Sequence, residues 1–217
     1  MELGRLGQRR GPNVRGVRPA LVYLIGHPAA GKYTIAQALA EEAAARGHRM
    51  VVVDNHHINN TIFGLLDVDG IRALPSRVWE IIADVRRAAL TAIEELGPPD
   101  WSYVFTNVLV AGDAEDEKIV RRLADLAHAR ASVYVPVRLL CDIDELSHRV
   151  VSPERRTRLK WMDPVGLRAF ASTHDLVDIS GHPAALDLDV TYRQPTESAI
   201  AILDHLTSSS IEPEVRP

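Results

Sequence analysis

Residues 21–34, Leu21-Val-Tyr-Leu-Ile-Gly-His-Pro-Ala-Ala-Gly-Lys-Tyr-Thr34, combine three local patterns in one short stretch. The apolar run Ala20–Ile25 predicts a short strand that is buried on both faces of a sheet. Small residues bounded by glycines follow it. The alanine-rich segment Tyr33–Arg46 then has the apolar period of a helix. The predicted order is therefore strand, glycine-bounded loop and helix.

The loop between these two elements fits the pattern G-x-x-x-x-G-K, in the strand-to-helix context in which that pattern binds phosphate. Small residues let successive backbone N–H groups turn inward around phosphate oxygens, and the free amides of the helix start add further donors. The lysine can then reach the β- and γ-phosphates of a nucleotide. The alternative is an ordinary glycine-rich turn. The residues expected to bind the nucleotide are Gly26, His27, Pro28, Ala29, Ala30, Gly31, Lys32, Tyr33 and Thr34.

An aspartate, Asp54, ends the second predicted strand, Arg49–Val53. The carboxyl ends of strands in a parallel α/β sheet face the ligand crevice, so Asp54 should lie beside Lys32. A carboxylate there can accept a proton from an attacking hydroxyl group or bind Mg²⁺. Two alternatives stay open: Asp54 only caps the following loop, and His56 and His57 face solvent instead of substrate.

The residue after Lys32 departs from the usual pattern, in which a serine or threonine binds Mg²⁺. Tyr33 stands at that position, and Thr34 follows it. We therefore expect Mg²⁺ to be held mostly through water and phosphate oxygens, with Thr34 and Asp54 as its candidate protein ligands.

The rest of the chain alternates between predicted strands and helices. This alternation predicts a three-layer α/β fold, with a parallel sheet of about five strands and helices on both faces. Residues 55–75 are polar and are expected to be irregular, and Pro136 is expected near the start of its strand. Strands are expected over residues 20–25, 49–53, 103–110, 133–141 and 186–191, and helices over 33–46, 76–95, 113–130, 144–150 and 196–206.

A cluster of positive charge follows the fourth strand. Phosphoryl transfer spreads negative charge over the equatorial oxygens of the moving group, and arginine, which is planar and always charged, suits that charge. The alternative is a solvated basic face on an amphipathic helix. The five cations within residues 149–160 are Arg149, Arg155, Arg156, Arg158 and Lys160.

Together the loop, Asp54 and this basic segment resemble the P-loop kinases related to zeta toxins and chloramphenicol phosphotransferases, in the wider adenylate-kinase-like group. The resemblance spans residues 19–206 and implies a P-loop NTPase fold. It implies that Asp54 is the base that activates the acceptor hydroxyl. It also implies that residues 152–164 form a lid over the phosphates, and the cations expected to act there are Arg149 and Arg155 or Arg156.

Composition and charge limit the classes of protein to which this chain can belong. The single cysteine, Cys141, excludes an intrachain disulfide framework and fits a reducing cytoplasm. The net charge of −4 argues against a broad contact with a nucleic-acid backbone, although residues 1–18 alone carry a net charge of +4. We expect residues 1–18 to be a disordered basic lead, residues 19–208 to be one domain and residues 209–217 to be a loose tail. No apolar run is long enough to cross a membrane.

Three functions remain compatible with these patterns. The first is transfer of phosphate from ATP, with Mg²⁺, to a hydroxyl group of a small molecule, by a monomer or a homodimer. The absence of an acidic residue beside Thr106 and Asn107 in the third strand favours this class over motor ATPases and GTPase switches. The second is a nucleotide-dependent regulatory module without a small-molecule acceptor. The third is a nucleic-acid function of the basic lead, which the overall charge disfavours.

Overall fold

The computed structural model describes residues 18–66, 68, 74–156 and 159–208. Its five strands form one parallel sheet in the order β2-β3-β1-β4-β5. This arrangement confirms the predicted α/β fold. The strands are β1 (Ala20–Gly26), β2 (Met50–Asp54), β3 (Ser102–Asn107), β4 (Val133–Leu140) and β5 (Leu186–Asp189).

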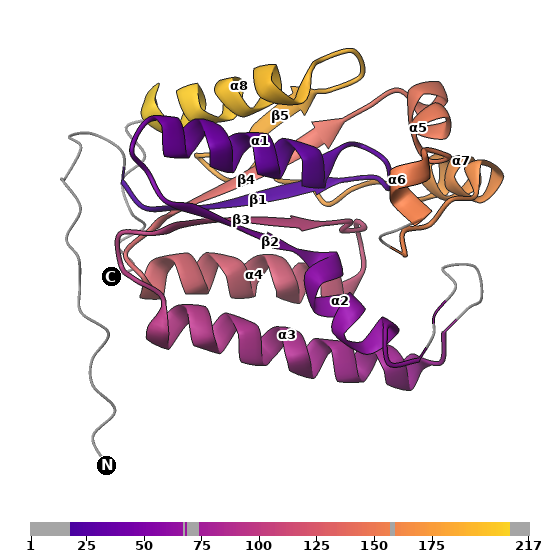
Figure 1. Ribbon diagram of the computed structural model, residues 1–217, viewed down its shortest axis with the longest axis horizontal. Helices are drawn as coiled ribbons and strands as arrows, with labels where there is room; N and C mark the ends of the chain where they lie inside the picture. The colour runs from indigo at the N-terminus through magenta and orange to yellow at the C-terminus, as the bar shows by residue number, and fades with distance from the viewer. Residues whose placement is uncertain (1–17, 67, 69–73, 157–158, 209–217) are drawn as a thin grey trace.

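Helices cover the sheet on both faces, as Figure 1 shows. α1 and α8 lie together on one face, and α3 and α4 lie on the other, so that the sheet is the middle of three layers. The helices are α1 (Lys32–Ala45), α2 (Asn55–Phe63), α3 (Ser76–Leu96), α4 (Ala114–Ala129), α5 (Ile143–Arg149), α6 (Pro153–Arg156), α7 (Pro164–Thr173) and α8 (Pro195–Ser208).

The central strand β1 is buried along its whole length, as its continuous apolar run predicts. Its alternate side chains enter two separate cores. Val22 and Leu24 pack in the core beneath α1 and α8, whereas Leu21 and Ile25 pack in the core beneath α3 and α4. β1 is thereby fixed in the middle of the sheet, and the loop that follows it emerges at the carboxyl edge.

Three helices, α2, α6 and α7, lie where none was predicted. Residues 55–63, expected to be irregular, form α2 directly after β2, because Phe63 packs with Val78 and Ile82 of α3. α7 falls in a segment for which no element was expected, and Asp163 caps it by accepting a hydrogen bond from the amide of Val165. Tertiary packing overrides the weak helix propensity of the Asn- and His-rich sequence of α2.

β3 and β5 end earlier than expected, the latter at Asp189 and not at Thr191, and Pro136 lies elsewhere in its strand than expected. β3 ends at Asn107, and Val110 leaves the sheet to form an isolated antiparallel bridge with Leu176. Pro136 lies inside β4 and not at its start. It is accommodated there because pairing of β4 with β5 begins only at Val137.

The carboxyl ends of β1, β2 and β3 meet at one edge of the sheet, where α2, α5, α6 and α7 gather (Figure 1). Only Arg18 of the predicted lead is among the described residues, and the whole predicted tail, residues 209–217, lies outside them. Within the described ranges no helix combines the length and apolarity needed to span a bilayer.

Candidate active site

The backbone of the loop after β1 is curled. Ala29 and Gly31 have positive φ angles of 69° and 84°, and the amide of Ala30 turns back to the carbonyl of His27 at 3.2 Å. Gly26 admits no side chain easily, since a Cβ atom there would lie 3.2 Å from the carbonyl oxygen of Leu139. These conformations aim successive amides inward, which is the geometry of an anion-binding nest.

The start of α1 offers its amides to a ligand. Gly31 stands at the N-cap position, and no side chain caps the first turn. Three other helices, α4, α5 and α7, are capped by Asp113, Asp142 and Asp163 respectively. Because the first amides of a helix have no intrahelical partner, the α1 terminus fits a phosphate group.

The side chain of Lys32 folds back onto the backbone of this loop. Its Nζ donates hydrogen bonds to the carbonyl oxygens of Gly26 at 2.7 Å and His27 at 2.8 Å. Burial, together with the nearby charges of Lys160 and Arg155, lowers the pKa of Lys32 to about 7, against the opposing effect of Asp54. The loop therefore holds a lysine whose charge a phosphate group would stabilise.

Asp54 is buried, with 3% of its surface exposed, at the end of β2. The hydroxyl of Thr106 on β3 donates to its Oδ1, and the Nζ of Lys160 lies 3.7 Å from its Oδ2. Its carboxylate caps neither α2 nor a loop, because no side-chain capping bond forms at the α2 start. The capping alternative is therefore wrong, and the carboxylate is held by a hydroxyl and an ammonium group.

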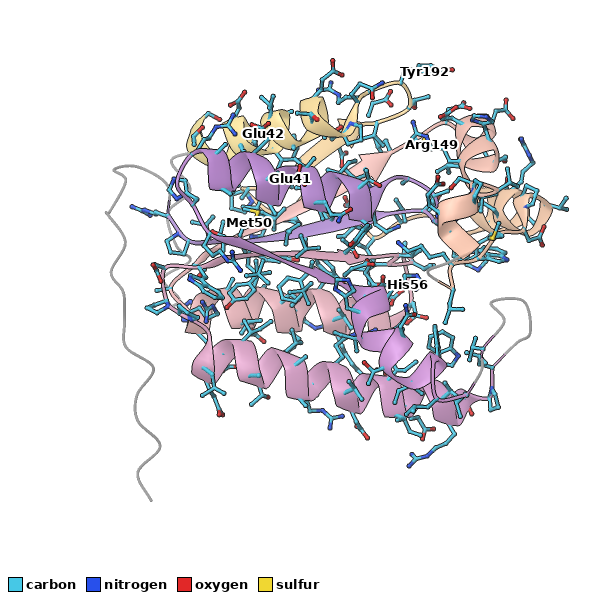
Figure 2. All side chains as sticks on the ribbon, in the orientation of Figure 1. Glu41, Glu42, Met50, His56, Arg149 and Tyr192 are labelled. Atoms are coloured by element: carbon cyan, nitrogen blue, oxygen red, sulfur yellow. The ribbon has the colours of Figure 1, made fainter. Side chains whose placement is uncertain are left out.

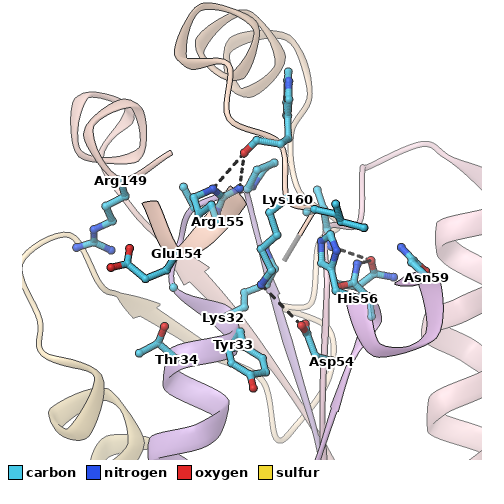
Figure 3. A pocket seen from close by; sticks show the side chains of 18 of the residues that line it. Lys32, Tyr33, Thr34, Asp54, His56, Asn59, Arg149, Glu154, Arg155 and Lys160 are labelled. Carbon is cyan, nitrogen blue, oxygen red and sulfur yellow. Dashed lines mark hydrogen bonds and ion pairs between the residues drawn. The ribbon is translucent and has the colours of Figure 1, made fainter. Parts of the chain in front are cut away.

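Lys160, one of the five cations of the basic segment but not among those expected to act on the phosphates, comes from the segment after α6 and enters the centre of the site (Figure 3). Its ammonium group lies 5.0 Å from the centre of the Tyr33 ring, a cation–π contact. Tyr33 also meets His57 edge to face at 5.9 Å. One signal was present in the sequence: the chain has only three lysines, and two of them, Lys32 and Lys160, are in this site.

The predicted lid arginines lie at the wall of the site and hold backbone carbonyl groups. Arg149 pairs with Glu145 at 2.7 Å and donates to the carbonyl oxygen of Thr191 at 2.5 Å. Arg155 donates to the carbonyl oxygen of Trp161 at 2.8 Å and 3.1 Å, and burial lowers its pKa. Arg156 ends α6, but its side chain and the whole of Arg158 lie outside the described residues.

These residues line one cavity of about 1140 Å³. One side of the cavity is formed by the loop, Thr34, Arg149 and the α5–α6 segment, and the other side by α2, α3 and the end of β3. Figure 3 shows Thr34 on the side of Tyr33 away from Asp54, so the side chains of the two candidate Mg²⁺ ligands are not in contact.

The described chain holds no cluster of three or more His, Cys, Asp or Glu residues suited to a metal ion. A single carboxylate with phosphate and water is nevertheless a usual Mg²⁺ site.

The two histidines after Asp54, His56 and His57, lie in different environments. His57 is exposed, as the solvent-facing alternative expects. His56 is half-buried and lines the cavity, and burial together with the charge of Lys160 lowers its pKa to about 4. His56 is therefore a neutral group of the site near pH 7.

Comparisons with known proteins identify the fold. A scan against models of protein families finds no match, and a search among curated proteins finds none either. Solved structures do match over most of the chain. A candidate kinase from Chloroflexus aurantiacus is similar with a TM-score of 0.60 and 20% identity, covering 89% of this chain and 99% of that one.

Two further solved structures have related architectures. A gluconokinase from Sinorhizobium meliloti matches with a TM-score of 0.51 and 18% identity, over 88% of this chain and 95% of that one. The APS kinase of Mycobacterium tuberculosis, in complex with AMPPNP and APS, matches with a TM-score of 0.55 and 16% identity, over 88% of this chain and 99% of that one. The chain thus has the three-layer fold of P-loop kinases.

Proposed function

We propose that this protein transfers the γ-phosphoryl group of ATP to a hydroxyl group of a small molecule. One observation carries the proposal: the buried carboxylate of Asp54, held by Thr106, lies in the same cavity as the phosphate loop of Lys32. Kinases among the structures of this fold support it. We place the chain, more finely, near the P-loop kinases related to zeta toxins and chloramphenicol phosphotransferases.

On the donor side, the loop amides and Lys32 bind the β- and γ-phosphates. Lys32 exchanges the carbonyl groups of Gly26 and His27 for phosphate oxygens, which restores its full positive charge. Thr34 and Asp54 are the residues we propose for Mg²⁺, through water and phosphate oxygens. When bound, Mg²⁺ neutralises charge that develops on the phosphates.

On the acceptor side, Asp54 acts as the base. Its carboxylate accepts the proton of the acceptor hydroxyl as that oxygen bonds to the γ-phosphorus. The bond from this phosphorus to the oxygen of the β-phosphate breaks in the same step. Thr106 occupies one carboxylate oxygen and so fixes the orientation of the other toward the cavity. A positioned base of this kind contributes roughly 10²–10⁴-fold to a rate.

The segment after α6 supplies positive charge. We propose that Lys160, together with Arg155 and Arg156, acts as the lid cation set when phosphate is bound, and that Arg149 borders the nucleotide. Lys160 is placed for this role because its ammonium group lies between the base and the loop (Figure 3). Electrostatic groups aimed at the moving phosphoryl group stabilise the transition state without reorganising.

The test combines two variants with a search for the acceptor. The protein is incubated with ATP and Mg²⁺ and a pooled library of hydroxylated metabolites, nucleosides and antibiotics, and products are identified by the added mass of one phosphate. We expect Lys32→Ala to lose ATP binding. Asp54→Asn should bind ATP but lose most of the transfer, with its folding unchanged.

Two results would count against the proposal. Full transfer by Asp54→Asn would show that the assigned base is wrong. Tight ATP binding with slow hydrolysis that no acceptor changes would favour the regulatory module instead. Lys118→Ala is the matched control, since Lys118 pairs with Glu115 on the exposed face of α4.

A further inference from the structure

An arginine on the acceptor side of the cavity has no strong partner. Arg86 of α3 is half-buried and lines the cavity. Its one hydrogen bond to a described residue joins Nη2 to Oδ1 of Asn59 at 3.5 Å, which is the long limit for such a bond. Among the described residues no carboxylate lies within ion-pair distance, 4.0 Å, of its guanidinium group. A guanidinium group has five N–H donors, so the described part of the chain leaves most of its hydrogen-bonding capacity unused.

The neighbouring arginines of α3 behave differently. Arg77 pairs with Glu80 at 2.7 Å and Arg87 pairs with Asp84 at 2.9 Å, all on the exposed face of the helix. Arg86 is instead turned inward. Partial burial of a cation without a paired anion is unfavourable, so a charged ligand is the natural counterpart of this position.

The polar groups around Arg86 belong to the acceptor side. Figure 3 shows Asn59, the contact of Arg86, on the side of Asp54 away from Lys32. Asp116 of α4, which also lines the cavity, interacts electrostatically with the guanidinium group. Its Oδ2 accepts a hydrogen bond from the amide of Val110 at 2.8 Å, and burial raises its pKa. Asp116 is thus committed to the backbone and only partly offsets the charge of Arg86.

An apolar wall continues from this charge toward the outer end of α3. Trp79 meets Phe63 edge to face at 5.8 Å, and both line the cavity. Trp79 and Arg86 are seven residues apart and so share one face of the helix, about 10 Å from each other along its axis. An acceptor of small-metabolite size spans that distance.

We propose that Arg86 binds an oxyanion of the phosphoryl acceptor, either a carboxylate or a phosphate group. The acceptor is then a hydroxylated anion and not a neutral sugar, alcohol or antibiotic. This inference rests on the proposed phosphotransferase function. The planar fork of arginine suits both oxyanions, because two parallel N–H groups can bond two oxygens.

The experiment measures binding with matched probes. The full chain is saturated with AMPPNP and Mg²⁺, so that the phosphate loop is occupied. Calorimetry then compares the affinity of each charged compound with that of its uncharged analogue. The pairs are gluconate with glucitol, as the carboxylate arm, and glycerol 3-phosphate with glycerol and ribose 5-phosphate with ribose, as the phosphate arm. The variants are Arg86→Gln, Arg86→Lys and the control Arg87→Gln.

We expect at least one charged compound to bind more tightly than its uncharged analogue. Arg86→Gln should reduce that preference by about 10- to 100-fold, the usual effect of losing a charged hydrogen bond. Arg86→Lys should retain part of it, and Arg87→Gln should leave it unchanged. No preference in any pair, or a preference that survives both Arg86 variants, would overturn the proposal.

A second measurement separates the two proposals. Each compound is incubated with ATP and Mg²⁺ and examined for the mass of one added phosphate. If binding depends on Arg86 but no compound gains a phosphate, the anion site is supported and the phosphotransferase function is contradicted. Phosphate gain by the neutral compounds alone keeps that function and overturns the anion site.

Discussion

The ammonium group of Lys160 lies 3.7 Å from Oδ2 of Asp54, and this contact joins the segment after α6 to the end of β2 across the cavity. Only 14% of the Lys160 side chain is exposed, so water screens the pair weakly. The distance exceeds that of a charge-assisted hydrogen bond. Lys160 is therefore held close to Asp54 only loosely, and in the proposed reaction a phosphate oxygen replaces the carboxylate as its partner.

Replacing Lys160 tests its proposed role. Lys160→Ala should lower kcat for phosphoryl transfer by about 10²–10³-fold, the usual cost of removing one group aimed at a transition state. ATP affinity should change much less, because the loop and Lys32 remain. Steady-state kinetics with the acceptor from the library search measures both. A kcat within twofold of the parent value would show that the lysine only closes the cavity.

The hydroxyl of Thr106 gives a second prediction. Thr106→Val keeps the size of the side chain but removes the donor to Asp54. We expect kcat to fall by about tenfold, since the base loses its fixed orientation, with no change in ATP affinity. Thr106→Ser should recover most of the rate. Equal rates for the valine and serine variants would contradict a positioning role for the hydroxyl.

The lowered pKa of Lys32 predicts a pH dependence. With a pKa of about 7 in the free protein, Lys32 loses its proton as the pH rises above 7. Phosphate binds the charged form, so ATP affinity should fall above pH 7, by up to about tenfold per pH unit, and binding should take up protons. Calorimetry from pH 7.5 to 9, in buffers of different ionisation enthalpy, measures both. Constant affinity over this range would exclude the lowered pKa.

The same group also predicts a trend in stability. The unfolded chain keeps the proton of Lys32 up to about pH 10, whereas the folded protein releases it near pH 7. Because the unfolded state then binds more protons, the free energy of unfolding of the unliganded protein should rise with pH between these values. Lys32→Met should flatten the rise when unfolding by urea is compared at pH 7 and 9.

A prediction independent of the reaction concerns Arg130. Its guanidinium group donates to the carbonyl oxygens of Ile93, Gly97 and Pro98 at 2.5, 3.1 and 2.7 Å, and it lies 4.9 Å from the centre of the Tyr103 ring. Arg130→Met leaves three carbonyl groups without this donor. We expect a loss of about 2–4 kcal/mol in the free energy of unfolding by urea.

Arg121→Met is the control for this experiment. Arg121 pairs with Glu117 at 3.6 Å on the exposed face of α4, and such pairs contribute about 0–1 kcal/mol. Both variants should keep the phosphoryl transfer rate per folded molecule. A similar small effect of the two substitutions would show that the end of α3 does not depend on Arg130.

Local patterns were sufficient for the framework of the fold. The apolar run of β1, the glycine-bounded loop and the alanine-rich α1 are each determined by neighbours in the sequence, and the alternation of strands and helices was enough to predict one parallel sheet. α2 could not be predicted in the same way. Its residues favour turns, and only the spacing of Ile58 and Ile62 indicated a helix, which packing against α3 stabilises.

The candidate site shows the same division. Sequence motifs pointed to Lys32 and Asp54, because both stand at strand ends or loop positions with a fixed place in the fold. Lys160 and Arg86 depend on contacts between segments distant in sequence, Asp54 with the segment after α6 and Asn59 with α3. The basic segment carried enough charge to be noticed, but no local pattern distinguishes the cation that faces the base from those that hold backbone carbonyl groups.

The position of the tryptophans has a practical consequence. Trp79 and Trp161 both line the cavity, whereas Trp101 stacks beneath Arg49 with 5.1 Å from the guanidinium carbon to the ring centre. Trp161 immediately follows Lys160 in the chain. Figure 2 labels two other residues that line the cavity, Arg149 at the end of α5 and His56 of α2. Intrinsic fluorescence therefore provides a label-free optical signal on each side of the cavity. Single Trp→Phe replacements would assign an emission change to nucleotide or to acceptor.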